Sequence, residues 1–330
     1  MSAQPSAIAP VTEPAAATRN RARWLEENGT LVLVVAAFAI VLVLSLRNAL
    51  DIDGWMALAS GREIAQHGLP GHDALAVWTH GHRWIDQQWL AQLTLFELWR
   101  LGGLKLALFV HLLFVAGALV GAAVLARRLG GSARAATWVC LPVLVAYYPE
   151  AAVLRPQTFA YPLFVAAFWL LASDARRPSR RVFLVVPVLV LWANLHGSVL
   201  LGAGLTSLAG VLHVAAAVRT RSLRPGLTGG LLALVAWPCM LASPYAAHLP
   251  SYYRTVVHGG NFSHFVSEWA PTTLTPATAP VYLLVFAGVW LLGRAGSRVS
   301  AFEKLAFVAL GVVAFDAVRN TAWLGLAALA

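Results

Sequence analysis

The run LVLVVAAFAIVLVLSL, residues 31–46, decides the class of this fold because it is apolar throughout and carries no charge. A helix that crosses a bilayer needs roughly 20 mostly apolar residues, and similar runs recur along the chain. Hydrophobic residues make up 59% of the sequence and charged residues 12%, with a mean hydropathy of +0.70. In an ordinary soluble domain about a quarter of the residues are charged. The sequence therefore predicts an all-α, multi-pass transmembrane helical bundle.

Nine further apolar runs follow the first one, which leads us to predict about ten spans. They lie at residues 104–126, 135–147, 158–172, 182–193, 199–217, 226–241, 280–292, 306–315 and 321–330. Several runs are short for a full span, so their ends must include neighbouring residues. No persuasive cleavage site follows residues 31–46, and we interpret that run as an uncleaved span and not as a signal peptide.

Basic residues predict the orientation of these spans. Cytoplasmic loops of membrane proteins carry an excess of Lys and Arg, and alternate loops of this chain do so. The clusters are Arg19, Arg21 and Arg23; Arg127, Arg128 and Arg134; Arg176, Arg177, Arg180 and Arg181; Arg219, Arg221 and Arg224; and Arg294, Arg298 and Lys304. We therefore expect residues 1–29 to be a disordered cytoplasmic tail and residues 30–330 to be a single transmembrane domain. The resemblance described below implies that the membrane is the bacterial cytoplasmic (inner) membrane.

The net charge of +10 is explained by this topology. The lipid bilayer is the expected partner, and no nucleic acid is. Cys140 and Cys239 both lie in apolar runs, so they are interpreted as small packing residues without a redox role.

Polar chemistry gathers in the first outer segment. Residues 51–89 read DIDGWMALASGREIAQHGLPGHDALAVWTHGHRWIDQQW and hold four aspartates, four histidines and four tryptophans. We expect the first outer loop, residues 51–103, to contain short interfacial helices and to be catalytic. A second long outer loop is expected at residues 243–279, so the active face is predicted outside.

Asp51 and Asp53 are the candidate catalytic bases. Their side chains are two positions apart where the first span meets water, and both point to one side if the segment is extended. Like charges close together at a partly dehydrated interface raise the pKa of one carboxyl group. The alternative is that an aspartate at a helix end is only a cap or a marker of topology.

A divalent cation is an open alternative, and no other cofactor is predicted. Asp51, Asp53 and His82 offer ligand types that such a cation accepts. His80 and His82 would face one ion in a strand, yet the sequence THGHR equally suits a plain turn.

Arginines at the outer face are candidates for binding a phosphate, because the planar guanidinium donates two parallel hydrogen bonds. The residues predicted to bind the phosphate of a donor substrate are Arg155, His196 and Arg254, and Arg319 is a further candidate. Arg155 alternatively pairs only with Glu150. Intramembrane polar residues such as those of WANLHG usually have a partner or a function, although Asn194 and His196 equally suit helix-end hydrogen bonds.

Further outer residues are predicted to contact substrate or acceptor. They are Trp55, Asp73, His80, His82, Trp84, Asp86, Asn194, Glu268 and Trp269. Tryptophan also gathers at membrane interfaces regardless of function, so a belt role stays open for the tryptophans. Glu268 lies on the second outer loop, in which Gly259–Gly260 makes a mobile lid a candidate.

The order of these features resembles the GT-C class of integral-membrane glycosyltransferases, which includes protein O-mannosyltransferases and the lipid A aminoarabinose transferase. The likeness covers nearly the whole chain and is closest to uncharacterised bacterial multi-pass members. Its motifs are Asp51-x-Asp53-x-Trp55, His67-Gly68-x-Pro70-x-x-Asp73, Trp84-x-Asp86-x-x-Trp89-Leu90, Arg155-Pro156-Gln157, Trp192-x-Asn194-x-His196-Gly197, Ser243-Pro244-Tyr245 and Glu268-Trp269-x-Pro271.

The resemblance implies a membrane glycosyltransferase that moves a sugar from a polyprenyl-phosphate donor to an envelope acceptor, with Asp51 at the position of the family's base. Two departures stand out. The Pro-Pro-Leu that usually ends the first loop is replaced by Ile85-Asp86-Gln87-Gln88-Trp89, and no soluble outer domain is present. The chain also ends inside an apolar run at Ala330, so we expect it to be shorter than a full family member.

Other classes of protein remain alternatives. A non-catalytic membrane assembly subunit would not need the acidic pair. A transporter of envelope glycolipid would use residues such as His111, His213 and Asp316 in or near spans, but the chain shows no internal repeat of the kind transporters carry. The nearest enzymatic alternative is an O-antigen-type ligase or polymerase.

Overall fold

The computed structural model describes residues 13–46, 49–258 and 266–330, and these ranges are helical. Apart from helices they contain one isolated antiparallel bridge, between His72 and Arg83. The longer helices are α1 (Glu13–Ser45), α2 (Ile52–His67), α3 (Trp89–Arg128), α4 (Ala133–Ala151), α5 (Ala160–Arg176), α6 (Val185–Leu195), α7 (Val199–Thr220), α8 (Leu223–Met240), α9 (Leu249–His258), α11 (Ala279–Arg294), α12 (Ala301–Asp316) and α13 (Thr321–Leu329). The all-α prediction is confirmed for the described residues.

Each of the ten predicted apolar runs overlaps one of these helices, but ten spans are not confirmed. By length and composition, four helical segments of the described chain are able to cross a membrane. They are Arg23–Ser45, Trp89–Arg128, Pro156–Arg176 and Val199–Thr220. Others are too short. The 11 residues of α6, at about 1.5 Å per residue, cover roughly half of a hydrocarbon core about 30 Å thick.

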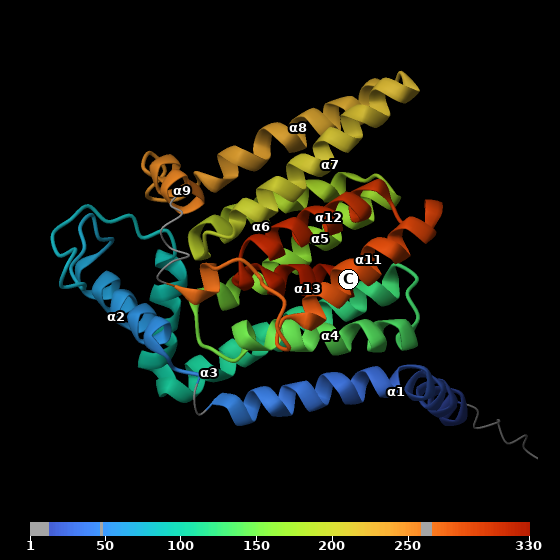
Figure 1. The fold of residues 1–330 in the computed structure, drawn as a ribbon, viewed down its shortest axis with the longest axis horizontal. Coiled ribbons are helices and arrows are strands. Elements are labelled where there is room, and N and C mark those ends of the chain that lie inside the picture. Colours follow the sequence, from blue (N-terminus) through green and yellow to red (C-terminus); the bar gives the residue numbers. More distant parts are fainter. Residues whose placement is uncertain (1–12, 47–48, 259–265) are drawn as a thin grey trace, which may run out of the picture.

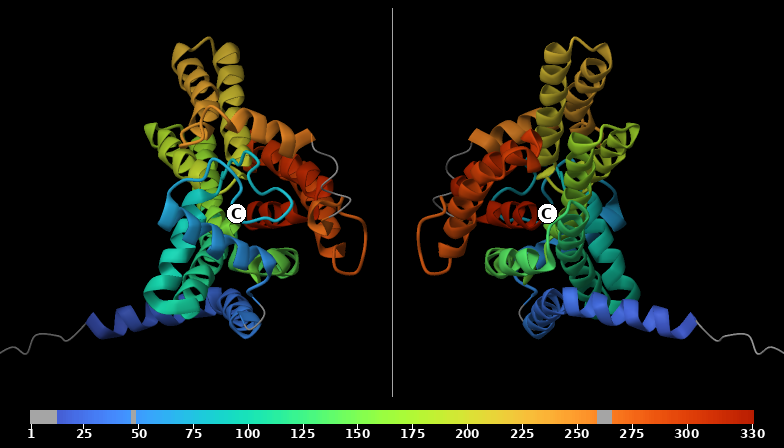
Figure 2. Two further views of the ribbon diagram at one scale, coloured as in Figure 1. Left: turned by 90° about the vertical axis from the view of Figure 1, so that its left-hand side faces the viewer. Right: turned by 90° about the vertical axis from the view of Figure 1, so that its right-hand side faces the viewer.

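The helices run side by side across the view of Figure 1, with α2 and the segment after it at one end of the bundle. The α7–α8 pair projects from one side and α1 lies along the opposite side (Figure 2). Aromatic side chains fill the centre. Trp323 packs against Tyr161, Phe164 and Trp192 at centroid distances of 5.0 to 5.9 Å, and these rings are almost fully buried.

The amino-terminal segment differs from the expectation of disorder. Residues 13–29 belong to α1, and the alanines and arginines near its start are among the best helix formers. Residues 1–12 lie outside the described residues.

The first outer segment is built around α2, which packs against the start of α3. At Gly61 an added Cβ would lie 2.1 Å from the carbonyl oxygen of Gln92, so the two helices approach closely only because Gly61 has no side chain. The helical course of α3 breaks at Gly102 and Gly103, where Gly103 has a φ of 67°. This break falls at the predicted end of the first outer loop.

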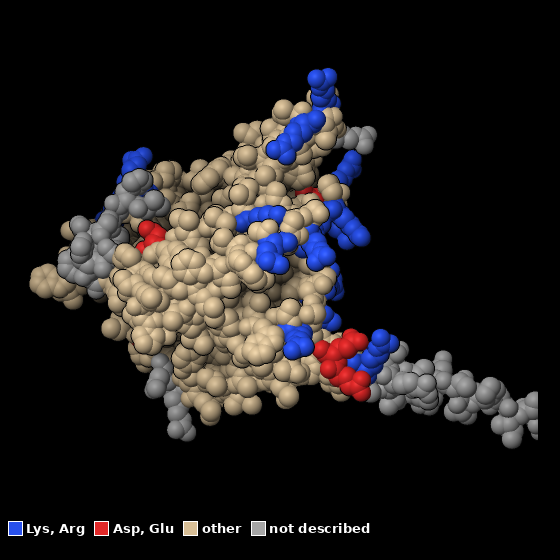
Figure 3. Space-filling view, turned by 45° about the vertical axis from the view of Figure 1, so that its right-hand side comes forward, with Lys and Arg blue, Asp and Glu red and all other residues tan. Residues whose placement is uncertain are grey.

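The two ends of the bundle differ in charge. The loops that join α3 to α4, α5 to α6, α7 to α8 and α11 to α12 lie at one end, and Figure 3 shows Lys and Arg side chains gathered over it. Arg176, at the end of α5, connects the α3–α4 loop with the start of α12, because it donates to the carbonyl of Leu129 at 2.7 Å and pairs with Glu303 at 2.7 Å. The acidic residues of the first outer segment lie at the opposite end.

Candidate functional site

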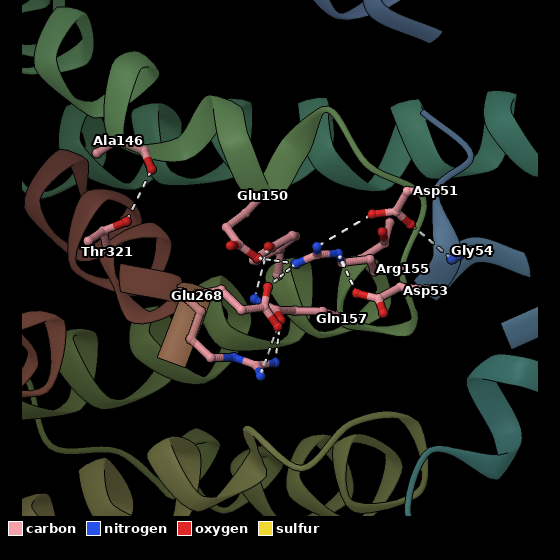
Figure 4. Close-up of polar contacts among 12 residues, drawn as sticks. Asp51, Asp53, Gly54, Ala146, Glu150, Arg155, Gln157, Glu268 and Thr321 are labelled. Atoms are coloured by element: carbon pink, nitrogen blue, oxygen red, sulfur yellow. Dashed lines mark hydrogen bonds and ion pairs between the residues drawn. The ribbon is translucent and has the colours of Figure 1, made fainter. Parts of the chain in front are cut away.

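The guanidinium of Arg155 is shared by four carboxylates, two from each side (Figure 4). Nε lies 3.0 Å from Oδ2 of Asp53, and Nη2 lies 3.6 Å from Oδ2 of Asp51. On the other side, Nη1 lies 2.5 Å from Oε2 of Glu268 and 3.5 Å from Oε2 of Glu150. Arg155 thus joins the start of α2, the end of α4 and the second outer segment in what we call the Arg155 centre.

The segment that carries Arg155 is held by hydrogen bonds on both sides. The backbone N–H of Leu154 donates to the carbonyl of Ala49 at 2.7 Å. His111, buried in α3, bonds through Nδ1 with Oγ1 of Thr158 at 2.8 Å and through Nε2 with the carbonyl of Ala151 at 2.9 Å. Because these bonds flank Arg155, its position is fixed by neighbours that do not face the centre.

Arg319 forms the second positive group of the centre. It lies in the short helix η6 (Val318–Asn320), donates to Oε1 of Gln157 at 3.2 Å and lies 3.4 Å from Oε1 of Glu268. Its guanidinium also stacks on the ring of Trp269 at 4.4 Å, an arrangement that stabilises a cation through the ring quadrupole. Glu268 therefore lies between the two arginines.

Asp51 and Asp53 reach Arg155 in different ways. Asp51 is the N-cap of α2, and its Oδ1 accepts the backbone N–H of Gly54 at 3.1 Å. The capping role considered for this residue is therefore present, together with a long contact to Arg155. Asp53 makes the shorter contact and its side chain is half exposed.

The surroundings of Asp53 change the pKa of its carboxyl group. Burial raises the pKa of the Asp53 carboxyl above its ordinary value, Arg155 opposes this effect, and Asp51 and Glu268 raise the pKa further. A carboxylate whose pKa is raised holds a proton more readily, which is the property of a general base.

His196 lies close to the centre but carries no charge. Burial, followed by the positive charges of Arg319 and Arg155, lowers the pKa of His196 to about 3. Its Nδ1 accepts the backbone N–H of Ser198 at 3.1 Å, which leaves Nε2 to carry the proton. A phosphate ligand would therefore gain at most a neutral hydrogen bond from His196.

The structure also places two further residues of the predicted site, Asn194 and Arg254. Asn194 accepts from Nε1 of Trp89 at 3.0 Å and donates to the carbonyls of Val190 and Ala242. These bonds tie α6 to its neighbours, as the helix-end interpretation expected. Arg254 lies at an exposed position of α9, and the proposed lid glycines, Gly259 and Gly260, lie outside the described residues.

His80 and His82 of the first outer segment lie in a turn. His82 accepts the backbone N–H of Asp73 and donates its own to Thr79, and the side chains of His80 and His82 are exposed. Among the described residues, no three His, Cys, Asp or Glu side chains are grouped so as to hold a metal ion. Trp55 is also exposed, at 60%.

Asp73, Trp84 and Asp86 come together at a separate cavity beside α2. Asp73 is fully bonded, because Oδ1 accepts from the backbones of Leu75 and Ala76 and Oδ2 accepts from Thr79. These bonds, the one from Ala76 first, lower the pKa of Asp73. Burial instead raises the pKa of Asp86 to about 7.

Gln157 was not singled out from the sequence as a site residue. It accepts from Arg319 and donates to the hydroxyl of Tyr161 at 3.1 Å, and so joins the centre to the aromatic core. The Arg-Pro-Gln motif was the available signal, but a polar residue at the start of an apolar run gives no indication of its partner.

No family model matches the chain, and no curated protein matches it. The Arg155 centre offers half-exposed carboxylates that accept protons and two guanidinium groups that bind anions, at one end of an apolar bundle.

Proposed function

We propose that this protein is a glycosyltransferase of the bacterial cytoplasmic (inner) membrane. It would move a sugar from a polyprenyl-phosphate donor to an envelope acceptor at the outer face. The observation that carries the proposal is the Arg155 centre, in which Asp51, Asp53 and Glu268 meet Arg155 and Arg319 at one end of an apolar bundle.

Arg319 is better placed than Arg155 to bind the donor phosphate. Arg155 faces four carboxylates, whereas within the described residues Arg319 donates to Gln157 and, at 3.4 Å, to Glu268. A phosphate that bound Arg155 would have to displace a carboxylate. We therefore assign the phosphate to Arg319, with Arg155 holding the acidic residues in place.

The charge of the centre sets a condition for donor binding. Four carboxylates face two guanidinium groups, so a further anion binds well only if a proton or another cation is taken up. Burial raises the pKa of Glu150 to about 7, so proton uptake is assigned to Glu150 and the Asp53 carboxylate stays free for the transfer step. Donor binding should consequently weaken as the pH rises.

The transfer step follows from these positions. Once the donor is bound, the carboxylate of Asp53 accepts the proton of the acceptor O–H or N–H group. The freed electron pair forms the new bond to the anomeric carbon, and the bond from that carbon to the phosphate oxygen breaks. The phosphate leaves with that electron pair and is stabilised by Arg319, because cationic donors stabilise developing negative charge.

The proposed function requires one orientation of the helix bundle in the membrane. The basic end of the bundle (Figure 3) would face the cytoplasm, in agreement with the excess of positive charge on that side of membrane proteins. The Arg155 centre at the opposite end would then face outward.

The test is a transfer assay with the purified protein in lipid nanodiscs, radiolabelled polyprenyl-phosphate sugars and an envelope glycan extract. Transfer is expected with the wild type and with Glu97→Gln, which removes an exposed carboxylate paired with Arg100. It is expected to be lost with Asp53→Asn and Arg319→Ala. Equal transfer by all four proteins would exclude the centre as the active site. Envelope glycans and lipid-linked sugars that are unchanged on deletion of the gene would overturn the proposed function itself.

A further inference from the structure

A cavity of about 140 Å³ lies beside α2 and is distinct from the Arg155 centre. Met56, Ser60 and Glu63 form its wall on α2, and the rest of its lining comes from the segment that follows. A dry engineered cavity of about 150 Å³ binds benzene, so this space suits a ligand of about the size of one six-membered ring.

Asp86 has one oxygen without a partner in the described part of the chain, although its carboxylate is hydrogen-bonded to the backbone of Gln88 and the side chain of Gln92. Its exposed fraction is 2%, and its Oδ2 atom has no hydrogen-bond partner within the described residues. Buried polar atoms are nearly always hydrogen-bonded in folded proteins. The other carboxylates of the lining have partners. Both oxygens of Asp73 accept hydrogen bonds from its own loop, and Glu63 pairs with Nδ1 of His67 at 3.0 Å.

The lining favours a cation over an anion. Three acidic residues, Glu63, Asp73 and Asp86, stand against a single basic one, His72. Trp84, which is 44% exposed, offers an aromatic ring, and a ring face attracts organic cations. Met56 and Leu75 supply apolar surface for the body of such a ligand.

We propose that this cavity binds a compact primary amine in its ammonium form, which donates a hydrogen bond to Oδ2 of Asp86 and packs against Trp84. The pKa of Asp86 is raised to about 7, as expected for a buried carboxyl group that has no positive charge beside it among the described residues. Below pH 7, ammonium binding is then accompanied by release of the Asp86 proton. The other titratable groups around Asp86 are Glu63, His72 and Asp73 of the lining, together with Tyr245 and Tyr252, whose hydroxyls stay neutral in this range.

The position of the cavity connects it with the Arg155 centre. Asp53, Met56, Ser60 and Glu63 are spaced by three, four and three residues, so they share one face of α2. Ser60 lies seven residues beyond Asp53, which is about 10 Å along a helix. Where the proposed function holds, the cavity binds the amino group of the acceptor, and the reacting group of that acceptor extends about 10 Å along α2 to Asp53.

The test uses a matched pair of probes, cyclohexylamine, which is a cation at neutral pH, and cyclohexanol, which is uncharged. Isothermal titration calorimetry is performed on the full chain in lipid nanodiscs at pH 6, in two buffers of different ionisation enthalpy. We expect cyclohexylamine to bind at least about tenfold more tightly than cyclohexanol, as a charged hydrogen bond implies. The heat should differ between the buffers by an amount that corresponds to close to one released proton.

Two variants and a control assign the binding to the cavity. Asp86→Asn should lower cyclohexylamine affinity at least about tenfold and abolish proton release, and Trp84→Leu should lower affinity without changing proton release. Glu97→Gln, outside the cavity, should behave as the wild type. Equal binding of both probes, or unchanged binding by Asp86→Asn, would overturn the proposal. The assay involves no transfer, so amine binding without transferase activity would refute only the proposed function.

Discussion

Nη1 of Arg155 lies 2.5 Å from Oε2 of Glu268, although 113 positions separate the two residues in the sequence. This contact joins the segment after α4 to the second outer segment and brings two distant motifs into one centre. Glu268 also contacts Arg319, so a single carboxylate orients both guanidinium groups.

Asp53→Asn should reduce sugar transfer by about 10² to 10⁴, the usual contribution of a general base. Asp51→Asn should cost less, because asparagine caps a helix as well as aspartate does and Asp51 already uses one oxygen for the cap. Initial transfer rates in nanodiscs, with the thermal midpoint Tm as a control for folding, measure the difference. A larger loss for Asp51→Asn than for Asp53→Asn would make Asp51 the base.

Arg319→Lys should weaken donor binding, because lysine replaces the planar guanidinium by a single ammonium group. Arg155→Lys should affect the Tm more than donor affinity, since it loosens contacts to four carboxylates at once. Binding of polyprenyl-phosphate sugar by surface plasmon resonance and thermal unfolding of the same samples separate the two effects. The reverse pattern would assign the phosphate to Arg155.

The Asp86 carboxyl should make the protein less stable as the pH rises. The folded protein holds this proton with a pKa of about 7, compared with 3.8 for an unperturbed carboxyl. Unfolding therefore releases a proton between these values, and the free energy of unfolding falls through this window by up to about 4 kcal/mol. Asp86→Asn should raise the Tm at pH 8 and leave it almost unchanged at pH 4. A Tm difference that is the same at both pH values would contradict the assignment.

Gly61→Ala should destabilise the packing of α2 on α3, because the new Cβ would lie 2.1 Å from the carbonyl oxygen of Gln92. Overpacking of this kind costs roughly 1–3 kcal/mol. Gly71→Ala is the matched control, since an added Cβ there meets nothing within 4 Å. Both are measured by thermal unfolding, and equal Tm values would show that the helices separate at little cost.

Cysteine labelling in intact cells tests the proposed orientation. A cysteine at Gly71 should react with an impermeant maleimide, and a cysteine at Ser179 should react only after the membrane is opened. Both positions are exposed in the structure, so a lack of reaction reports the membrane barrier. Reaction at position 179 in intact cells would reverse the orientation and remove the outward-facing site.

Much of the helical fold was predictable, because apolar composition and run length are local properties. The runs 104–126 and 199–217 lie within α3 and α7, and the predicted loop end at residue 103 coincides with the break at Gly103. The number of spans was not predictable in the same way. Short apolar helices such as α6 and α13 are buried against other helices, and composition alone does not distinguish protein contact from lipid contact.

The site was predictable in its types of residue but not in its pairings. Asp51, Asp53, Arg155 and Glu268 were all candidates, and the structure brings them together. Sequence offered no means of placing Glu268 on Arg155, or Asp86 in a separate cavity, because these contacts depend on how distant segments pack. The preference for Asp53 over Asp51 also comes from geometry, since a capping bond appears only once the helix start is known.

The two hydrogen bonds of His111 decide whether this buried histidine can relay protons. A histidine in the middle of an apolar bundle invites a role in passing protons from one side of the membrane to the other. Such a relay passes protons through hydrogen bonds on both sides of the ring, but Nε2 of His111 bonds with the carbonyl of Ala151, which has no proton to pass on, and Thr158 occupies Nδ1. His111 therefore has a structural role. If its replacement reduces activity, we expect the cause to be a displaced Arg155 and not an interrupted proton path.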